Sequence, residues 1–281
     1  MGAGSAAGHL ARPVPSGTGM GLPAAVRDRV AAAHRGSTLP ERLRLYDSWA
    51  ARYEQDVAAL EYRAPHLAAA SLAFAFVPRA GTRLLDVACG TGLVARELHR
   101  RGFRCLHGVD GSAGMLERAR STGLYEELRL CVLGTEPLPA PAEHYDAVTL
   151  VGALGEGQVP STVLPELLRV TKPGGFLCLT TRSNRSNLRY KAELEAALGQ
   201  LERSGAWQKL LAQETCSCSS CSHVPGEQVA SIPSGAVPPC EICVCPCPSP
   251  RACHIFHTRP PHGSCHPPAS SPMFWGPCVH Q

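Results

Sequence analysis

Short apolar runs alternate with helical segments from residue 82 to about residue 203, and this alternation constrains the fold more than any other feature of the sequence. The runs typical of strands are TRLLDVA, FRCLHGVD, LRLCVLG, YDAVTLVGA and FLCLTTR, with helix-like segments such as GTGLVARELHRRG between them. Strands that alternate with helices form a parallel sheet with helices on both faces, because the crossovers are right-handed. We therefore predict an α/β fold built on a doubly wound, Rossmann-like sheet.

The segment before the first predicted strand divides into a lead and a helical cap. Residues 1–22 consist mainly of Gly, Ala, Ser and Pro without an apolar period, so we predict that they are disordered. Residues 23–80 are predicted to form helices. In the longest of these, aromatic side chains recur at spacings of three and four, which places them on one face: Tyr46, Trp49 and Tyr53.

The composition changes abruptly near residue 215. Ten of the 14 cysteines lie in residues 216–281, together with 13 prolines and no leucine. Because such a segment has little apolar material for a core, we predict that residues 212–281 are a disordered, low-complexity tail, best explained as an alternative splice or read-through product. Some of its cysteine spacings occur in zinc sites, but they are irregular, so we assign no metal-binding residue.

A glycine-rich turn follows the first predicted strand and indicates a nucleoside-binding site. Gly90 and Gly92 lack Cβ atoms, so a ligand can lie against the backbone N–H groups that begin the next helix. Asp110 ends the second strand, where a carboxylate can accept both hydroxyl groups of a ribose. Asp86 favours a cationic ligand over a pyrophosphate, and Ala88 replaces the first glycine of the dinucleotide fingerprint. S-adenosylmethionine is a nucleoside that carries a positive charge.

The strings LLDVACGTG, GVDGSAGML, YDAV and ELLRVTKPGGFL resemble, in this order, the motifs of the class I S-adenosylmethionine-dependent methyltransferases. Further resembling segments, among them YDSWAARYEQDVAALEYRAPHLA, VGALGEGQVP and TTRSNRSNLRYK, extend the resemblance over residues 24–211. It implies S-adenosylmethionine as cofactor, a cofactor-binding domain over residues 81–211 and a lid formed by the preceding helices. Sheets of this family end in a hairpin of two strands. Because no segment after residue 215 has that pattern, we predict a sheet without its last two strands.

The resemblance also implies which residues hold the cofactor. The first turn would hold its amino-acid end, Asp110 its ribose, and the residues after the second and third strands its adenine. The two tyrosines of the helical cap would close over it, with ordinary helix packing as the alternative. The complete set is Tyr46, Tyr53, Asp86, Ala88, Cys89, Gly90, Gly92, Asp110, Gly111, Met115, Thr135, Glu136 and Val151.

The predicted function is methyl transfer from S-adenosylmethionine to an unidentified acceptor, either a small molecule or a protein. Transfer by in-line attack depends on proximity and desolvation, so it requires no acid or base, and we assign no catalytic residue. Cys89 has no recognisable base near it in the sequence and is better explained by packing than as a nucleophile. The alternative is a protein that binds the cofactor but is catalytically inactive and serves as a scaffold or partner.

The composition of the whole chain bears on its partners and location. With 27 basic and 23 acidic side chains, the net charge of +4 gives no signature of nucleic-acid binding. No apolar run approaches the ~20 residues that span a bilayer, and the N-terminus lacks the apolar region of a signal peptide. We therefore expect a protein of the cytoplasm, the nucleus or both that does not contact membranes. We also expect a monomer.

Overall fold

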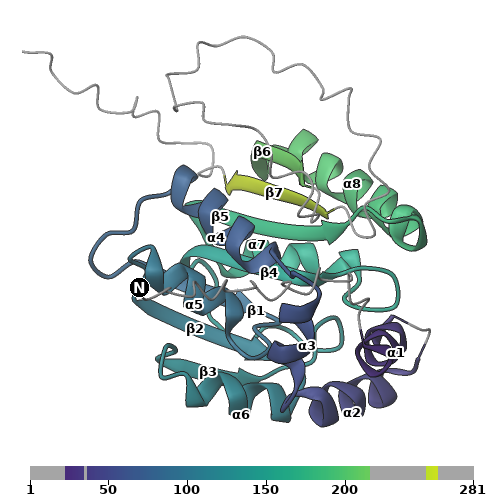
Figure 1. Cartoon of the computed structure of the whole chain (residues 1–281). Helices are drawn as coiled ribbons and strands as arrows, with labels where there is room; N and C mark the ends of the chain where they lie inside the picture. Colours follow the sequence, from purple (N-terminus) through teal and green to yellow (C-terminus); the bar gives the residue numbers. More distant parts are fainter. Residues whose placement is uncertain (1–22, 35–36, 216–250, 259–281) are drawn as a thin grey trace, which may run out of the picture.

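A seven-stranded sheet forms the centre of the protein, with helices packed on both of its faces (Figure 1). The computed structural model describes residues 23–34, 37–215 and 251–258. The strand order is β3-β2-β1-β4-β5-β7-β6. The strands are β1 (Arg83–Val87), β2 (Cys105–Asp110), β3 (Glu127–Leu130), β4 (Tyr145–Leu154), β5 (Thr171–Arg182), β6 (Trp207–Thr215) and β7 (Arg251–Thr258).

Strands β1 to β5 are parallel, as the alternation of strands and helices predicts. The middle of β1 shows the register, because Leu84 pairs with Leu106 of β2 on one side and with Ala147 of β4 on the other. Strand order reverses beside β1, where the chain has crossed from β3 back to β4. In doubly wound sheets a ligand binds outside the carboxyl ends of the strands at such a point. The doubly wound α/β prediction is confirmed.

The prediction that the sheet lacks its last two strands is wrong. Strand β7 pairs antiparallel with both β5 and β6, so β5 is not an edge strand. The boundary predicted at residue 211 falls inside β6, and residues 251–258 of the supposed tail belong to the sheet. The rest of that tail, and the lead over residues 1–22, lie outside the described residues.

Alternating side chains of the central strands enter two separate cores. On one face, Leu84 and Ile255 pack with residues of α4 and α5. On the other face, Leu85 and Phe256 pack with residues of α7 and α8. The side chains of Ile255 and Phe256 in β7 are at most 1 % exposed and point to opposite faces, so this strand is buried on both faces like its parallel neighbours. The sheet therefore depends on β7 for part of both cores.

Helices α1, α2 and α3 lie together at one end of the sheet (Figure 1). The predicted amphipathic helix is broken in two, since α2 ends at Trp49 and α3 begins at Tyr53. The Trp49 indole donates to the buried Asp56 carboxylate (2.7 Å), which also accepts two hydrogen bonds from Arg29 of α1. The helices are α1 (Ala24–Ala33), α2 (Leu39–Trp49), α3 (Tyr53–Ala59), α4 (Ala64–Ala75), α5 (Leu93–Arg100), α6 (Ala113–Ser121), α7 (Leu164–Val170) and α8 (Leu188–Arg203).

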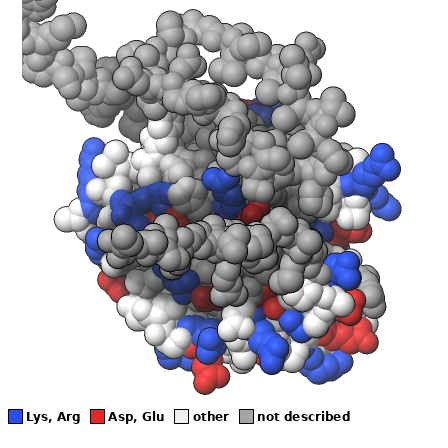
Figure 2. Space-filling model, viewed as in Figure 1, with Lys and Arg blue, Asp and Glu red and all other residues white. Residues whose placement is uncertain are grey.

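The surface carries charges of both signs. On the described part of the face in Figure 2, the basic and acidic side chains are interspersed, so this part has no broad field of one sign. None of the helices described here is both long and apolar enough to span a bilayer.

Candidate functional site

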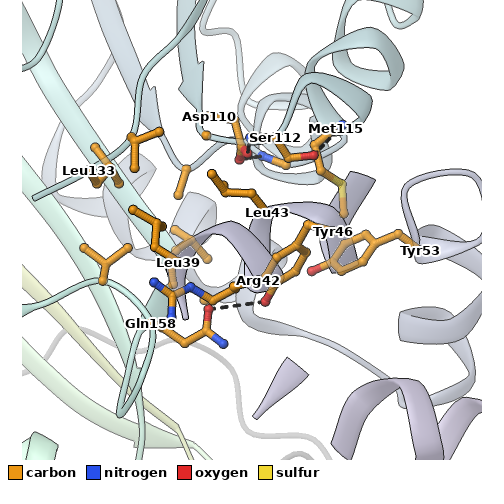
Figure 3. A pocket seen from close by; sticks show the side chains of 18 of the residues that line it. Leu39, Arg42, Leu43, Tyr46, Tyr53, Asp110, Ser112, Met115, Leu133 and Gln158 are labelled. Carbon is orange, nitrogen blue, oxygen red and sulfur yellow. Dashed lines mark hydrogen bonds between the residues drawn. The ribbon is translucent and has the colours of Figure 1, made fainter. Parts of the chain in front are cut away.

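A cavity lies at the carboxyl ends of β1, β2 and β4 and is covered by α2 and α3 (Figure 3). Its position is the one expected for a ligand of a doubly wound sheet. Apolar side chains make up most of its lining, and Arg42 and Asp110 carry the charges among the described lining residues. The lining consists of Leu39, Arg42, Leu43, Tyr46, Tyr53, Tyr62, Ala88, Gly90, Asp110, Gly111, Ser112, Met115, Val132, Leu133, Val151, Gly152, Ala153, Gln158 and Val159.

The turn after β1 brings backbone N–H groups to the end of β2. Ala88, Gly90 and Gly92 all have positive φ angles (54°, 55° and 91°), which turn the chain sharply between β1 and α5. Glycine adopts this conformation without strain, whereas the side chain of Ala88 makes it unfavourable. The N–H of Gly90 consequently points at the Asp110 carboxylate and donates to its Oδ2 at 2.8 Å.

Asp110 is fixed in place by the backbone around it. The Ser112 N–H donates to Oδ1 at 2.8 Å, so each carboxylate oxygen accepts a backbone hydrogen bond, and the Gly111 backbone also favours the charged carboxylate. Burial raises the pKa of Asp110, and these two hydrogen bonds act in the opposite direction. Each oxygen keeps a further acceptor position, and the side chain lines the cavity. This geometry allows the carboxylate to accept two hydroxyl groups of one ligand.

Asp86 lies behind the turn and does not line the cavity. Its side chain is fully buried, and it accepts hydrogen bonds from the Tyr125 hydroxyl (2.7 Å) and the Thr149 hydroxyl (2.9 Å). Burial raises the pKa of Asp86 to about 7, although both hydrogen bonds oppose this rise. The carboxylate therefore ties β1 to β4 and to the segment before β3.

One face of α2 forms the cover of the cavity. Leu39, Arg42, Leu43 and Tyr46 have the spacing of a single helical face, and Leu43 points toward Asp110 (Figure 3). The Tyr46 hydroxyl donates to Gln158 Oε1 at 3.4 Å, and burial raises the pKa of Tyr46 to about 12. The spacing of three and four in the sequence identified Leu43 and Tyr46 on this face. Continuing the same period toward the N-terminus would have identified Leu39 and Arg42.

Contacts between α2 and α6 hold this cover in place. Asp47 Oδ1 accepts hydrogen bonds from the Ser112 hydroxyl (2.5 Å) and from the Gly114 N–H (2.9 Å). A Cβ atom at Gly114 would lie 2.9 Å from the backbone oxygen of Asp47, so only glycine permits this approach. Because Ser112 also bonds Asp110, the cover and the carboxylate belong to one hydrogen-bonded network.

Comparisons with known proteins assign the family. Residues 85–179 match the family model described as "Methyltransferase domain". The chain is 58% identical over 188 residues to human "Methyltransferase-like protein 27", and this alignment covers 66% of the chain and 76% of the relative. The chain belongs to the class I S-adenosylmethionine-dependent methyltransferases.

Two further similarities of this methyltransferase are more distant. It is 41% identical over 111 residues to a demethylmenaquinone methyltransferase of Symbiobacterium thermophilum, covering 36% of the chain and 43% of that relative. The methyltransferase therefore spans less than half of that bacterial relative. In a solved structure, "Complex between the Haloferax volcanii Trm112 methyltransferase activator and the putative methyltransferase", one chain has the same fold (TM-score 0.52, 18% identity). That similarity covers 78% of this chain and 98% of the Haloferax volcanii chain.

The structure brings most of the predicted cofactor residues of this methyltransferase to the cavity. Tyr46, Tyr53, Ala88, Gly90, Asp110, Gly111, Met115 and Val151 line it. Asp86, Cys89, Gly92, Thr135 and Glu136 do not.

The two predicted adenine contacts after β3 lie in an exposed loop outside the lining. Glu136 Oε1 accepts a hydrogen bond from the Val132 N–H (2.8 Å), so Glu136 positions Val132, which lines the cavity. Sequence analysis missed Val132 and Leu133, although they follow β3 directly and the rule for carboxyl ends of strands applies to them.

Proposed function

We propose that this chain binds S-adenosylmethionine in the cavity beneath α2 and transfers its methyl group to a small-molecule or protein acceptor. The observation that carries the proposal is the geometry of Asp110, whose two oxygens are each anchored by one backbone N–H and each offer a second acceptor position. Two adjacent hydroxyl groups of a ribose match this pair of acceptors. The family and the fold imply a cofactor of this kind.

The other lining residues suit the remaining parts of the cofactor. The backbone from Ala88 to Gly90 is the proposed contact of its amino-acid end. Gly111, Met115 and the pair Val132–Leu133 form an apolar slot beside Asp110, which suits an adenine ring. Each of these groups comes from the carboxyl end of a different strand, so the cofactor would contact β1, β2 and β3 together.

The five predicted residues outside the lining are given supporting roles. Asp86 would keep the first turn in position through its hydrogen bonds to Tyr125 and Thr149. Cys89 and Gly92 would shape that turn, and Gly92 begins α5 with a left-handed φ. Thr135 and Glu136 would hold Val132 through the hydrogen bonds of their loop.

When bound, S-adenosylmethionine supplies a methyl group on a cationic sulfur, which a nucleophilic atom of the acceptor takes by in-line displacement. The residues of this chain contribute position and exclusion of water. Leu43 and Tyr46 cover the cavity from above, and Val151 and Gly152 form its floor at the end of β4. Among the described lining residues Asp110 is the one carboxylate, and the proposal assigns it to the ribose, so we assign no general base.

Calorimetry with S-adenosylhomocysteine tests the binding half of the proposal. We expect saturable binding that is lost in Asp110→Ala and retained in Glu117→Gln, since Glu117 is an exposed carboxylate on α6 that does not line the cavity. Formation of S-adenosylhomocysteine from S-adenosylmethionine in the presence of cell extract tests catalysis. Binding without turnover would support the inactive scaffold, and absence of binding would contradict both functions.

Hydrogen exchange tests the role of the cover. If Tyr46 and Tyr53 close over the cofactor, the amides of α2 exchange more slowly when S-adenosylhomocysteine is bound, because local opening is suppressed. Helix α8, which contributes nothing to the lining, serves as the internal reference. Equal exchange of α2 with and without ligand would show that the tyrosines only pack against their neighbours.

A further inference from the structure

Three side chains of different chemistry converge at the amino end of β2, at the opposite end of the strand from Asp110. Cys105 and His107 are two residues apart in β2, so they project from the same face of the sheet. Glu126 immediately precedes β3, and its backbone N–H donates to Leu106 O at 2.8 Å. One ligand atom from each of the three side chains lies within 4.8 Å of the other two.

The individual distances are close to those of a metal site. The Cys105 Sγ donates to Glu126 Oε2 at 2.9 Å, and His107 Nε2 lies 3.7 Å from the same oxygen. Ligand atoms bonded at about 2.0–2.3 Å to a tetrahedral zinc ion are separated by roughly 3–4 Å. Small side-chain adjustments would therefore place sulfur, nitrogen and oxygen around one ion, which would replace the shared thiol proton.

The imidazole of His107 is already oriented for this task. Its Nδ1 lies 3.1 Å from the hydroxyl of Tyr145 and 3.5 Å from a carboxylate oxygen of Glu127. Tyr145 is 3 % exposed and sits in β4, so it holds the ring firmly. In metal sites the second ring nitrogen of a ligating histidine is usually held by such a partner, which leaves Nε2 for the metal. In this cluster Nε2 is the nitrogen that faces Glu126.

The net charge of the side chains around the cluster is compatible with a bound cation. Glu126 and Glu127 contribute two negative charges, and their side chains are 59% and 39% exposed. Arg83 of β1 is the register partner of Cys105 and contributes one positive charge, which favours the thiolate but opposes a cation. Arg129 pairs with Glu127 at 2.5 Å and contributes a second positive charge. Once Cys105 has lost its proton to the solvent, the thiolate and the two glutamates outweigh the two arginines by one negative charge, and the exposed Glu126 gives an ion access from solvent. A set of sulfur, imidazole and carboxylate selects zinc and similar borderline metals over magnesium and calcium.

We propose that Cys105, His107 and Glu126 bind a divalent cation of the zinc type, with the fourth position taken by water. Such an ion would tie β2 to the edge strand β3, where the sheet has no further neighbour among the described strands. Strand β3 leads directly to Val132 and Leu133 of the cavity. The site is separate from the methyl-transfer cavity, because it lies at the opposite end of β2.

Thiol labelling of the full chain, resolved by peptide, tests the site without relying on activity. Cleavage after Arg104 and Arg118 yields a peptide with Cys105 as its one cysteine, which separates it from the cysteines of residues 216–281. We expect Zn²⁺ to slow alkylation of Cys105 at least tenfold, since a metal-bound thiolate is protected, and Mg²⁺ to leave the rate unchanged. Circular dichroism with and without Zn²⁺ verifies that the fold is the same.

Two variants decide whether the protection comes from this cluster. Glu126→Gln changes an exposed side chain and should abolish the protection while leaving the fold intact, and His107→Gln should do the same. Glu117→Gln, which removes a carboxylate from an exposed position of the same peptide, should retain it. Equal alkylation with and without Zn²⁺, or protection that survives both ligand variants, would overturn the proposal.

Discussion

The parallel strands and the antiparallel pair of the sheet differ in what they contribute to the site. The carboxyl ends of β1, β2 and β4 form the cavity, whereas the described residues of β6 and β7 line none of it. Yet Ile255 and Phe256 of β7 are as deeply buried as Leu84 and Leu85 of β1. The comparison indicates that one half of the sheet carries both stability and ligand binding, while the other half carries stability alone. Substitutions in the two halves should therefore separate these two properties.

The largest expected effect is on the antiparallel side. Phe256 is 1 % exposed and stacks on Trp207 with ring centroids 4.4 Å apart. Phe256→Ala should lower the free energy of unfolding by about 3–5 kcal/mol, because it removes a large buried side chain and leaves a cavity. Urea denaturation measures this loss, and Leu210→Ala in β6, where the side chain is 48% exposed, is the control. A change in S-adenosylhomocysteine affinity of the folded variant would contradict the division between the two halves.

The second effect belongs to the parallel side, where we expect ligand affinity to fall while stability changes little. Asp110→Asn keeps the size of the side chain but loses the charge and one acceptor oxygen. Binding of S-adenosylhomocysteine should weaken by about 2–3 kcal/mol, on the order of 30- to 150-fold, as expected for lost charge-assisted hydrogen bonds. The unfolding free energy should change much less than in Phe256→Ala. Unaltered affinity by calorimetry would remove Asp110 from the ribose site.

The third effect concerns the helical cover and depends on pH. The hydrogen bonds from Arg29 hold the pKa of Asp56 below its ordinary value, against the effect of burial. A depressed folded pKa gives stability that is present above the unfolded value near 4 and is lost as the pH falls through the folded value. Asp56→Asn should therefore cost about 1–2 kcal/mol at neutral pH and progressively less below about pH 4. Denaturation of both proteins from pH 7 to pH 3 provides the measurement, and a constant difference would refute the linkage.

The smallest effect lies in the first turn. Ala88 has a φ of 54°, a conformation that costs an L-residue with a side chain more than it costs glycine. Ala88→Gly should raise the free energy of unfolding by about 0.5–1 kcal/mol, the relief of strain being reduced by the greater freedom of glycine in the unfolded chain. Thermal unfolding at several scan rates would measure it. A lower stability would indicate that the methyl group of Ala88 contributes packing that outweighs the strain.

The parallel half of the sheet could be predicted from sequence because its strands are buried on both faces. Strand β1 has the apolar run Leu84-Leu85, and comparable runs mark β2, β4 and β5. Strand β7 has no such local signal, since His254 and His257 flank Ile255 and Phe256 in a segment without leucine. Its burial results from pairing with β5, which is distant in the sequence, and no local pattern reports that pairing.

The candidate site was predictable to the extent that it follows from strand ends. Asp110 and the turn to Gly90 come from such positions and line the cavity. Asp86 also ends a strand, but Tyr125 and Thr149 enclose it, and neither contact is visible in the sequence. Gln158 reaches the cavity through the loop after β4, whose path depends on packing against α2. Local patterns therefore locate the ligand, whereas the closing elements require the tertiary structure.

The separation of β6 and β7 along the chain has a consequence during synthesis on the ribosome. Residues 216–250 are made after β6 and before β7, which at about 5–20 residues per second takes a few seconds. During that interval the nascent chain already contains β5, and the backbone groups that will pair with β7 have no intended partner yet. An unpaired strand edge with apolar side chains is a target for other chains, so this interval is when a chaperone would have the most to protect. Slowing translation over residues 216–250 would lengthen that exposure without altering a single contact of the finished protein.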